Sequence, residues 1–126
     1  MNARMRAVQA LWEAVGAQEW MDIPAFFTED AVIRWPNTRE RFTVLDYVRA
    51  NSDYPGDWRT KVRRLDAVGD TVIALVRITD AGGATSLHVV SYCTFAGDRI
   101  ARMEEYYSED GEPPAWRGEQ SIGERY

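Results

Sequence analysis

Apolar and polar residues alternate with a period of two through the stretch 84–108, which predicts a β-hairpin. Alternate side chains of its first strand would point to opposite faces of a sheet. One face is mostly apolar and comprises Leu87, Val89, Ser91, Cys93 and Phe95. The other is mixed and comprises His88, Val90, Tyr92 and Thr94. Turn residues follow at 96–98, and Ile100 resumes the apolar pattern. The mixed face suits either a cavity wall or a solvated surface.

The beginning of the chain has helical periodicity instead. Asn2 is a candidate N-cap, and apolar residues recur after it at Val8, Leu11, Trp12 and Val15. This spacing predicts an amphipathic helix that ends near residue 16. A second, shorter helix is expected from Asp22, with Pro24 in its first turn.

A third helix is predicted over residues 44–50. Thr43 followed by Asp46 is close to a capping box, and Leu45 and Val48 would face inward.

The remaining segments are rich in β-branched residues and are separated by turns. Strands are predicted at 31–35, 59–67 and 71–79, with turns at 69–70 and 80–84. Together with the hairpin, the later strands form an antiparallel meander. Helices followed by long strands predict an α+β architecture, with three helices laid across one face of a curved, mainly antiparallel sheet.

After residue 108 the composition changes to Glu, Pro, Gly and Arg. We therefore expect one domain over residues 1–108 and an irregular tail over residues 109–126, packed on the domain by Trp116 or extending from it.

Composition excludes several classes of protein. The formal charge of −5 argues against a nucleic-acid partner, because neutralising phosphates needs a concentrated basic face. The single cysteine, Cys93, excludes an internal disulfide and is expected to be a small buried residue. No residue spacing is typical of a zinc site or a nucleotide loop, so we expect no metal and no cofactor. No stretch resembles a membrane span or a signal peptide, and a cytoplasmic protein is expected.

The order of the elements and several strings resemble the NTF2-like superfamily, in particular its SnoaL-like (polyketide-cyclase-like) branch. The resemblance covers nearly the whole chain and rests on ALWEAVGAQEWMDIPAFFTEDAVIRWP, ERF, YPGDW, GDRIARMEEYYS and PPAW. It implies a cone-shaped half-barrel with a mostly apolar pocket at its open end and a homodimer formed through the sheet. It is weak evidence for an activity, because one fold hosts many activities.

The resemblance also implies positions for acid/base residues. In SnoaL-type cyclases, a histidine on one late strand works with an aspartate on the next. In members similar to limonene-epoxide hydrolase, an aspartate five residues after the isoleucine of the glycine turn lies in the pocket. Here that position is Glu105, five residues after Ile100. The hydrolases' second aspartate and arginine belong to the middle strand, which offers only Arg77 and Thr79, or Val76 and Ile78. Epoxide hydrolysis is therefore disfavoured.

The residue types themselves suggest a similar set. His88 is the side chain whose ordinary pKa lies near neutrality, and a carboxylate on the next strand would orient its ring. Adjacent Glu104 and Glu105 point to opposite faces of a strand, so at most one joins a pocket, and the resemblance favours Glu105. The candidate catalytic residues are His88, Glu105 and, as a donor to a developing enolate, Tyr92. The candidate ligand-binding residues are Trp12, Trp35, Tyr54, Trp58 and Tyr107.

These residues also have purely structural interpretations. His88 and Glu105 could be solvated or salt-bridged strand residues, and the tryptophans could be core. Tyr54 and Trp58 flank a Pro-Gly loop and could form a rim.

Three functions stay open. The first is a cofactor-independent isomerase, cyclase or dehydratase acting on a small apolar carbonyl compound by general acid/base catalysis. The second is a protein that binds a hydrophobic ligand without turnover, and the third is a dimeric interaction protein with a vestigial pocket. A buried His88–carboxylate pair beside an open cavity would favour the first. An open cavity lined only by aromatic and aliphatic groups would favour the second, and a pocket filled by the chain's own side chains the third.

Overall fold

A computed structural model describes residues 1–83 and 85–126 of the protein. The elements, in chain order, are α1 (Ala3–Gly16), the 3₁₀ helix η1 (Trp20–Phe26), β1 (Phe27–Trp35), β2 (Glu40–Phe42), α2 (Val44–Ser52), β3 (Trp58–Val68), β4 (Thr71–Asp80), β5 (Ser86–Ala96), β6 (Arg99–Glu109) and α3 (Ala115–Glu119). The predicted turn over residues 80–84 ends at Ala84, which lies outside the described residues.

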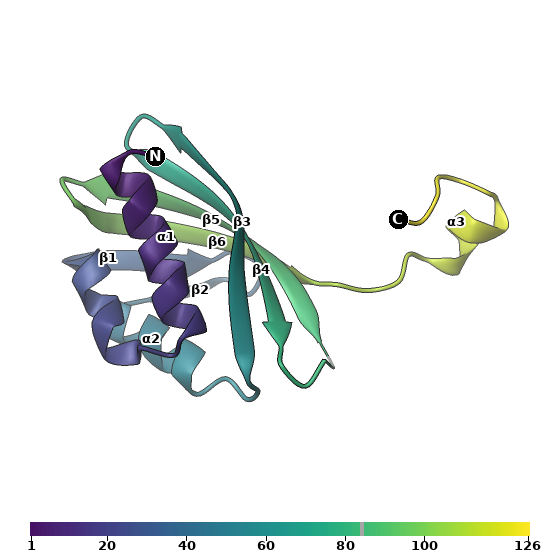
Figure 1. The fold of residues 1–126 in the computed structure, drawn as a ribbon, viewed down its shortest axis with the longest axis horizontal. Coiled ribbons are helices and arrows are strands. Elements are labelled where there is room, and N and C mark those ends of the chain that lie inside the picture. Colours follow the sequence, from purple (N-terminus) through teal and green to yellow (C-terminus); the bar gives the residue numbers. More distant parts are fainter. Residues whose placement is uncertain (84) are drawn as a thin grey trace.

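The strands form one six-stranded sheet in the order β2-β1-β6-β5-β4-β3. The β1–β6 pair is parallel and the other pairs are antiparallel. Figure 1 shows the sheet strongly curved, with α1 lying across one face and α2 below it. The expected α+β architecture with a mainly antiparallel sheet is confirmed. The short strand β2, which pairs with β1, has no clear pattern in the sequence.

Local sequence signals fix where the two longer helices begin. The Asn2 side chain accepts a hydrogen bond from the Met5 amide at 2.8 Å, and Thr43 caps α2 by accepting from the Asp46 amide at 3.2 Å. Each cap satisfies an amide that has no partner within its helix. The helix beginnings predicted from the sequence are therefore confirmed. The short second helix, in contrast, is a 3₁₀ helix rather than an α-helix.

The inward face of α2 differs from the prediction. Leu45 is 72% exposed, whereas Val44 and Tyr47 are buried and Val48 is half-buried. The prediction that Leu45 faces inward is wrong because the apolar stripe starts at the first helical residue, Val44, and continues at helical spacing through Tyr47. This change places a tyrosine hydroxyl inside the domain.

Helix α1 lies closely against β3 and β4. The Thr60 hydroxyl of β3 donates a hydrogen bond to the Trp12 carbonyl at 2.7 Å. A methyl group on Gly16 would lie only 2.3 Å from the same hydroxyl oxygen. Glycine at the end of α1 therefore allows the helix to approach the sheet and brings Trp12 over the concave face.

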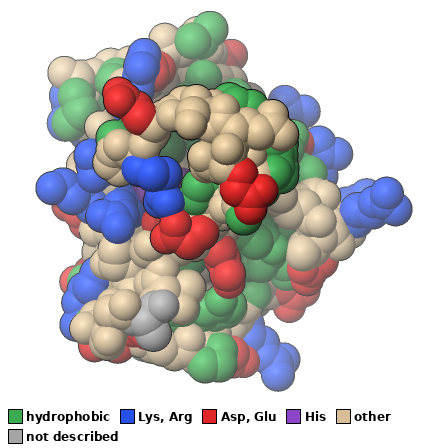
Figure 2. Space-filling view, turned by 90° about the vertical axis from the view of Figure 1, so that its right-hand side faces the viewer, with side chains coloured by type: hydrophobic (Ala, Val, Ile, Leu, Met, Phe, Trp, Pro, Cys, Tyr) green, Lys and Arg blue, Asp and Glu red, His purple; other side chains and the backbone are tan. Residues whose placement is uncertain are grey.

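The C-terminal tail leaves the domain after β6. Figure 1 shows it running away from the sheet, with α3 near its end, and every residue from 108 to 126 is exposed. Trp116 is 52% exposed, so the tail does not pack on the domain through Trp116 and instead extends from it. A five-residue helix also stands where an irregular segment was expected. Figure 2 shows acidic and basic side chains intermixed on the side from which the tail extends.

Candidate active site

The concave side of the sheet encloses a cavity of about 400 Å³. Its walls come from α1, the beginning of η1, the end of β1, the end of α2 with the following loop, the beginning of β3, and the inward faces of β4, β5 and β6. Its lining comprises Trp12, Val15, Gln18, Trp20, Trp35, Ala50, Asn51, Ser52, Tyr54, Gly56, Trp58, Ile78, Leu87, Val89, Glu105, Tyr107 and Glu109. Six of these side chains are aromatic. The size and the apolar, aromatic walls are typical of small-molecule sites.

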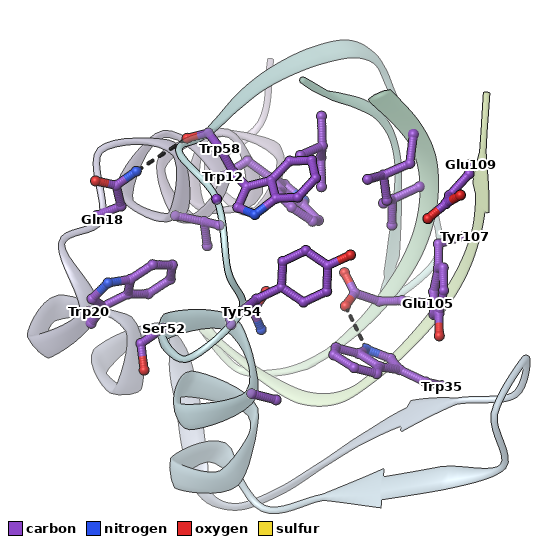
Figure 3. A pocket seen from close by; sticks show the side chains of 17 residues that line it. Trp12, Gln18, Trp20, Trp35, Ser52, Tyr54, Trp58, Glu105, Tyr107 and Glu109 are labelled. Atoms are coloured by element: carbon purple, nitrogen blue, oxygen red, sulfur yellow. Dashed lines mark hydrogen bonds between the residues drawn. The ribbon is translucent and has the colours of Figure 1, made fainter. Parts of the chain in front are cut away.

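Glu105 is the one buried carboxylate of the described residues and lies in the wall of this cavity, where Figure 3 shows it beside Trp35. The Trp35 indole Nε1 donates to Glu105 Oε1 at 3.0 Å, and the Ser91 hydroxyl donates to Oε2 at 2.5 Å. Burial raises the pKa of Glu105, because the charged form loses its hydration, while hydrogen bonds from Ser91, Trp35 and Tyr47 partly offset the shift. The site therefore holds an oriented carboxyl group of increased basicity.

Aromatic side chains fix the indole that holds Glu105. The Trp35 ring makes edge-to-face contacts with Phe42, Tyr47 and Tyr107, at centroid distances of 4.5, 6.2 and 5.8 Å. Tyr47 is buried. Burial is the main cause that raises the pKa of its phenol, and the nearby Glu105 carboxylate is the second cause. Tyr47 therefore stays a neutral hydrogen-bond donor.

A second aromatic pair forms the rim. The rings of Tyr54 and Trp58 lie 5.1 Å apart, and the Trp58 indole is tied back to the Pro55 carbonyl at 2.9 Å. Gly56 between them has φ of +125°, and a methyl group there would lie 2.7 Å from the Trp58 Nε1 atom. Position 56 therefore requires glycine for two reasons: the positive φ is unfavourable for other residues, and a side chain would overlap the Trp58 indole. Figure 3 shows Tyr54 reaching over the cavity, with its hydroxyl directed toward the Glu105 side.

The five predicted ligand-binding residues, Trp12, Trp35, Tyr54, Trp58 and Tyr107, all line the cavity. Trp12 has a further feature: its Nε1 is buried and has no hydrogen-bond partner among the described residues. A buried N–H group without a partner is unfavourable, which makes it an available donor next to the cavity.

The predicted pair of His88 and Glu105 is not formed. His88 lies on the opposite, solvent-facing side of β5, where its Nδ1 contacts Asp110 Oδ1 at 2.5 Å. Tyr92 lies on the same outer side, 42% exposed, with its ring 6.3 Å from that of Tyr106. The physical reason is the pleat of the strand. Ser91 is directly opposite Glu105, and His88 is three residues from Ser91, so it points to the other face.

Ser91, Tyr47 and Asp110 are partners of the candidate residues that the sequence did not identify. The alternation of the hairpin strand could have indicated Ser91, because this polar residue lies on the same face as four apolar ones and so needs a buried partner. Asp110 was assigned to the tail, although the chain still follows the sheet there: its amide donates to the Ser86 carbonyl at 2.9 Å.

The middle strand presents only aliphatic groups to the interior. Val76 is fully buried and Ile78 lines the cavity, whereas Arg77 is exposed on the other face. The carboxylate and arginine that the resemblance to epoxide hydrolases would require on this strand are thus missing from the cavity. Within the described residues, no group of His, Cys, Asp and Glu could hold a metal ion, and no helix is long and apolar enough to cross a membrane.

Known proteins share this architecture. The chain is similar to the "putative ketosteroid isomerase" of Kribbella flavida, with 29% identity, a TM-score of 0.83 and coverage of 98% of this chain and 90% of that one. An NTF-2 like protein of unknown function from Burkholderia xenovorans has 23% identity, a TM-score of 0.79 and coverages of 98% and 96%.

An LEH-like epoxide hydrolase of M. tuberculosis has 17% identity, a TM-score of 0.69 and coverages of 84% and 83%. At these identities the second and third structures show a common fold alone. No curated protein matches the chain. The SnoaL-like domain family matches residues 8–103, and the chain therefore belongs to this family and has the NTF2-like fold.

Proposed function

We propose that the protein is a cofactor-independent isomerase or cyclase that moves a proton on a small apolar carbonyl compound, with Glu105 as the general base and acid. The observation that carries this proposal is a single buried carboxyl group, with a raised pKa, in the wall of an aromatic cavity. A base whose pKa approaches the operating pH accepts and returns a proton most effectively. The predicted roles of His88 and Tyr92 in this step are withdrawn, because both side chains lie outside the cavity.

The reaction follows from the arrangement of donors. The Glu105 carboxylate takes a proton from the carbon next to the substrate carbonyl, and the electron pair of that C–H bond moves to the carbonyl oxygen as an enolate. The protonated Glu105 then gives the proton to a second carbon as the enolate collapses. Three donors use three of about four lone-pair positions of a carboxylate, so one remains for the substrate proton. The Tyr54 hydroxyl and the Trp12 indole are the groups that would stabilise the enolate oxygen.

The test is isomerisation of a β,γ-unsaturated cyclic ketone to its conjugated isomer, followed by absorbance, with monocyclic and fused-ring probes. We expect Glu105→Gln to lower kcat/KM by about 100-fold or more. Glu29→Gln, which removes an exposed carboxylate that is not part of the cavity lining, is the matched control and should leave the rate unchanged. Equal rates for the wild type and Glu105→Gln would overturn the proposal.

Binding without turnover is the second candidate. It is favoured by the same hydrogen bonds, because a carboxylate held by Trp35, Ser91 and Tyr47 is also a rigid structural group. Four of the five tryptophans line the cavity, so their fluorescence reports occupancy directly. Saturable fluorescence changes with the same ketones, without hydrogen exchange at the carbon next to the carbonyl in heavy water, would support this function over catalysis.

We also infer a homodimer through the outer sheet face, defined here as the solvent-facing side of β3–β6 with Lys61, Leu75, Arg77, Val90, Tyr92 and Tyr106. Tyr92 and Tyr106 are each 42% exposed there, and a sheet with apolar groups on both faces usually needs a second layer. Light scattering after gel filtration should give twice the mass of one chain, and Tyr92→Glu should shift it toward the monomer. A monomeric wild type at high concentration would refute the dimer.

A further inference from the structure

We infer that the cavity selects its ligand by charge: it takes neutral or cationic ring compounds and rejects acids. The inference extends the proposed function, because it names the class of compound that reaches Glu105. The lining holds two carboxylates, Glu105 and Glu109, and no Lys, Arg or His. The six aromatic rings add negatively polarised faces, which attract cations. An anionic ligand would therefore enter without any charged partner, at a large desolvation cost.

The two carboxylates mark opposite ends of the cavity. They lie four residues apart on the inward face of β6, which corresponds to about 13 Å between their backbone positions. Glu105 is 3% exposed at the inner end, whereas Glu109 is exposed at the strand end, and Figure 3 shows the two apart on the same strand. Glu109 makes no salt bridge with a described residue, so its charge is available to a ligand.

The geometry therefore points to a substrate with its carbonyl at Glu105 and a protonated amine or other hydrogen-bond donor at the Glu109 end, separated by an apolar ring system. Aromatic rings of the lining would contact the cationic end through their faces. Substrates that carry a carboxylate or phosphate inside the cavity are excluded by the same charges.

Calorimetric titration of the full chain with three probes of one shape tests the inference: naphthylmethylammonium, naphthylmethanol and naphthoate. We expect the ammonium probe to bind about three- to ten-fold more tightly than the alcohol, and naphthoate at least about ten-fold more weakly than the alcohol. Glu109→Gln should reduce the ratio of ammonium affinity to alcohol affinity, whereas the control Glu29→Gln should leave this ratio unchanged. The preference should also weaken as salt is added.

Naphthoate binding as tightly as the alcohol, or an ammonium preference unaffected by Glu109→Gln, would overturn the inference. Binding of none of the three probes would overturn it as well. Its failure is distinguishable from that of the proposed function, because ketone isomerisation and its loss in Glu105→Gln do not depend on the charge preference at Glu109.

A separate observation concerns the tail, and we propose that it is an arm that packs on the outer sheet face of a second copy. This proposal rests on the homodimer inferred above. The tail is internally ordered: Arg125 pairs with Glu112, and the Ile122 amide donates to the Arg117 carbonyl at 2.9 Å. Nevertheless it buries nothing on its own domain, since Trp116 and Ile122 are 52% and 54% exposed. An ordered segment that presents large apolar side chains to water is typical of an interaction surface.

The place where the tail begins and the charges of the two surfaces favour the outer sheet face as the surface that the arm binds. Asp110, where the tail begins, is held on that face by Ser86, His88 and Arg77, the last at 4.0 Å. Beyond Asp110, residues 111–126 carry three carboxylates and two arginines, so the arm itself has a small excess of negative charge. The β3 and β4 part of the outer sheet face carries cations, including Lys61 directly opposite Arg77. Two copies related by a two-fold axis would exchange arms in this way.

A photoreactive benzoylphenylalanine in place of Trp116 in the full chain tests the arm. Irradiation of a mixture of normal and heavy-isotope-labelled protein should give crosslinks between copies that map to the outer sheet face. In addition, Trp116→Ala should raise the dissociation constant of the dimer by about ten-fold or more. Crosslinks confined to one chain, or an unchanged dissociation constant in a dimeric wild type, would overturn the arm and leave the dimer standing.

Discussion

Replacing the buried carboxyl group of Glu105 by an amide should stabilise the protein at neutral pH. Burial raises the pKa of Glu105, so the folded state binds its proton more tightly than the unfolded state does. The stability contributed by this group is therefore fully present below the ordinary glutamate pKa and is lost as the pH rises through the raised value. Glu105→Gln mimics the protonated form at every pH and removes this loss.

The size of the effect follows from two opposing contributions. Each pKa unit of elevation corresponds to about 1.4 kcal/mol of lost stability in the wild type at high pH. Against this, the amide NH2 group cannot accept one of the hydrogen bonds that the two carboxyl oxygens accept from Trp35 and Ser91, at a cost of about 1 kcal/mol. We expect a net gain in the free energy of unfolding at pH 8, and each 1 kcal/mol of gain would raise Tm by roughly 3–5 °C for a chain of this length.

Thermal and urea unfolding between pH 4 and 8 measure this difference, and the neighbouring Glu104→Gln is the control. Glu104 lies on the other face, where hydrogen bonds from Tyr106 and Arg34 lower its pKa. Its contribution is present above the ordinary pKa and is lost in acid, so Glu104→Gln should be less stable at pH 8, by under about 1 kcal/mol. The reasoning is refuted if Glu105→Gln is less stable than the wild type at pH 8 and the difference disappears in acid.

Three further predictions concern the cavity and the contact of α1 with the sheet. Trp35→Phe removes a hydrogen-bond donor to Glu105 and should lower the free energy of unfolding in urea by about 1–3 kcal/mol. Trp12→Phe removes an N–H group without a partner and should cost less. Equal losses would contradict the hydrogen-bond assignments. Gly16→Ala should lower the free energy of unfolding by about 1–3 kcal/mol, because its methyl group would overlap Thr60. The double variant Gly16→Ala with Thr60→Ala should lose less stability than the sum of the two single variants in the same measurement. Gly56→Ala should weaken ketone binding in a fluorescence titration by displacing Trp58 from the rim, while unchanged binding would exclude Trp58 from the site.

The sequence alone determined the elements that depend on local chemistry. The caps at Asn2 and Thr43, the turns and the period-two strands follow from neighbouring residues, so helix beginnings and most strands were predictable. The resemblance to SnoaL-like proteins added the positions of Glu105 and Trp35, both of which line the cavity. Strand β2 and the 3₁₀ form of η1 were not predictable, because three strand residues and seven helical residues contain too little pattern.

Only the tertiary structure decided which chemical groups meet. Period two shows that His88 and Ser91 point to opposite faces of β5, but it does not say which face is concave. That choice depends on how α1 and α2 cover the sheet, and it moved His88 and Tyr92 outside while it placed Ser91 against Glu105. The same packing turned Tyr47 rather than Leu45 inward and raised the pKa of Glu105 through burial, a property that arises only when residues distant in sequence exclude water together.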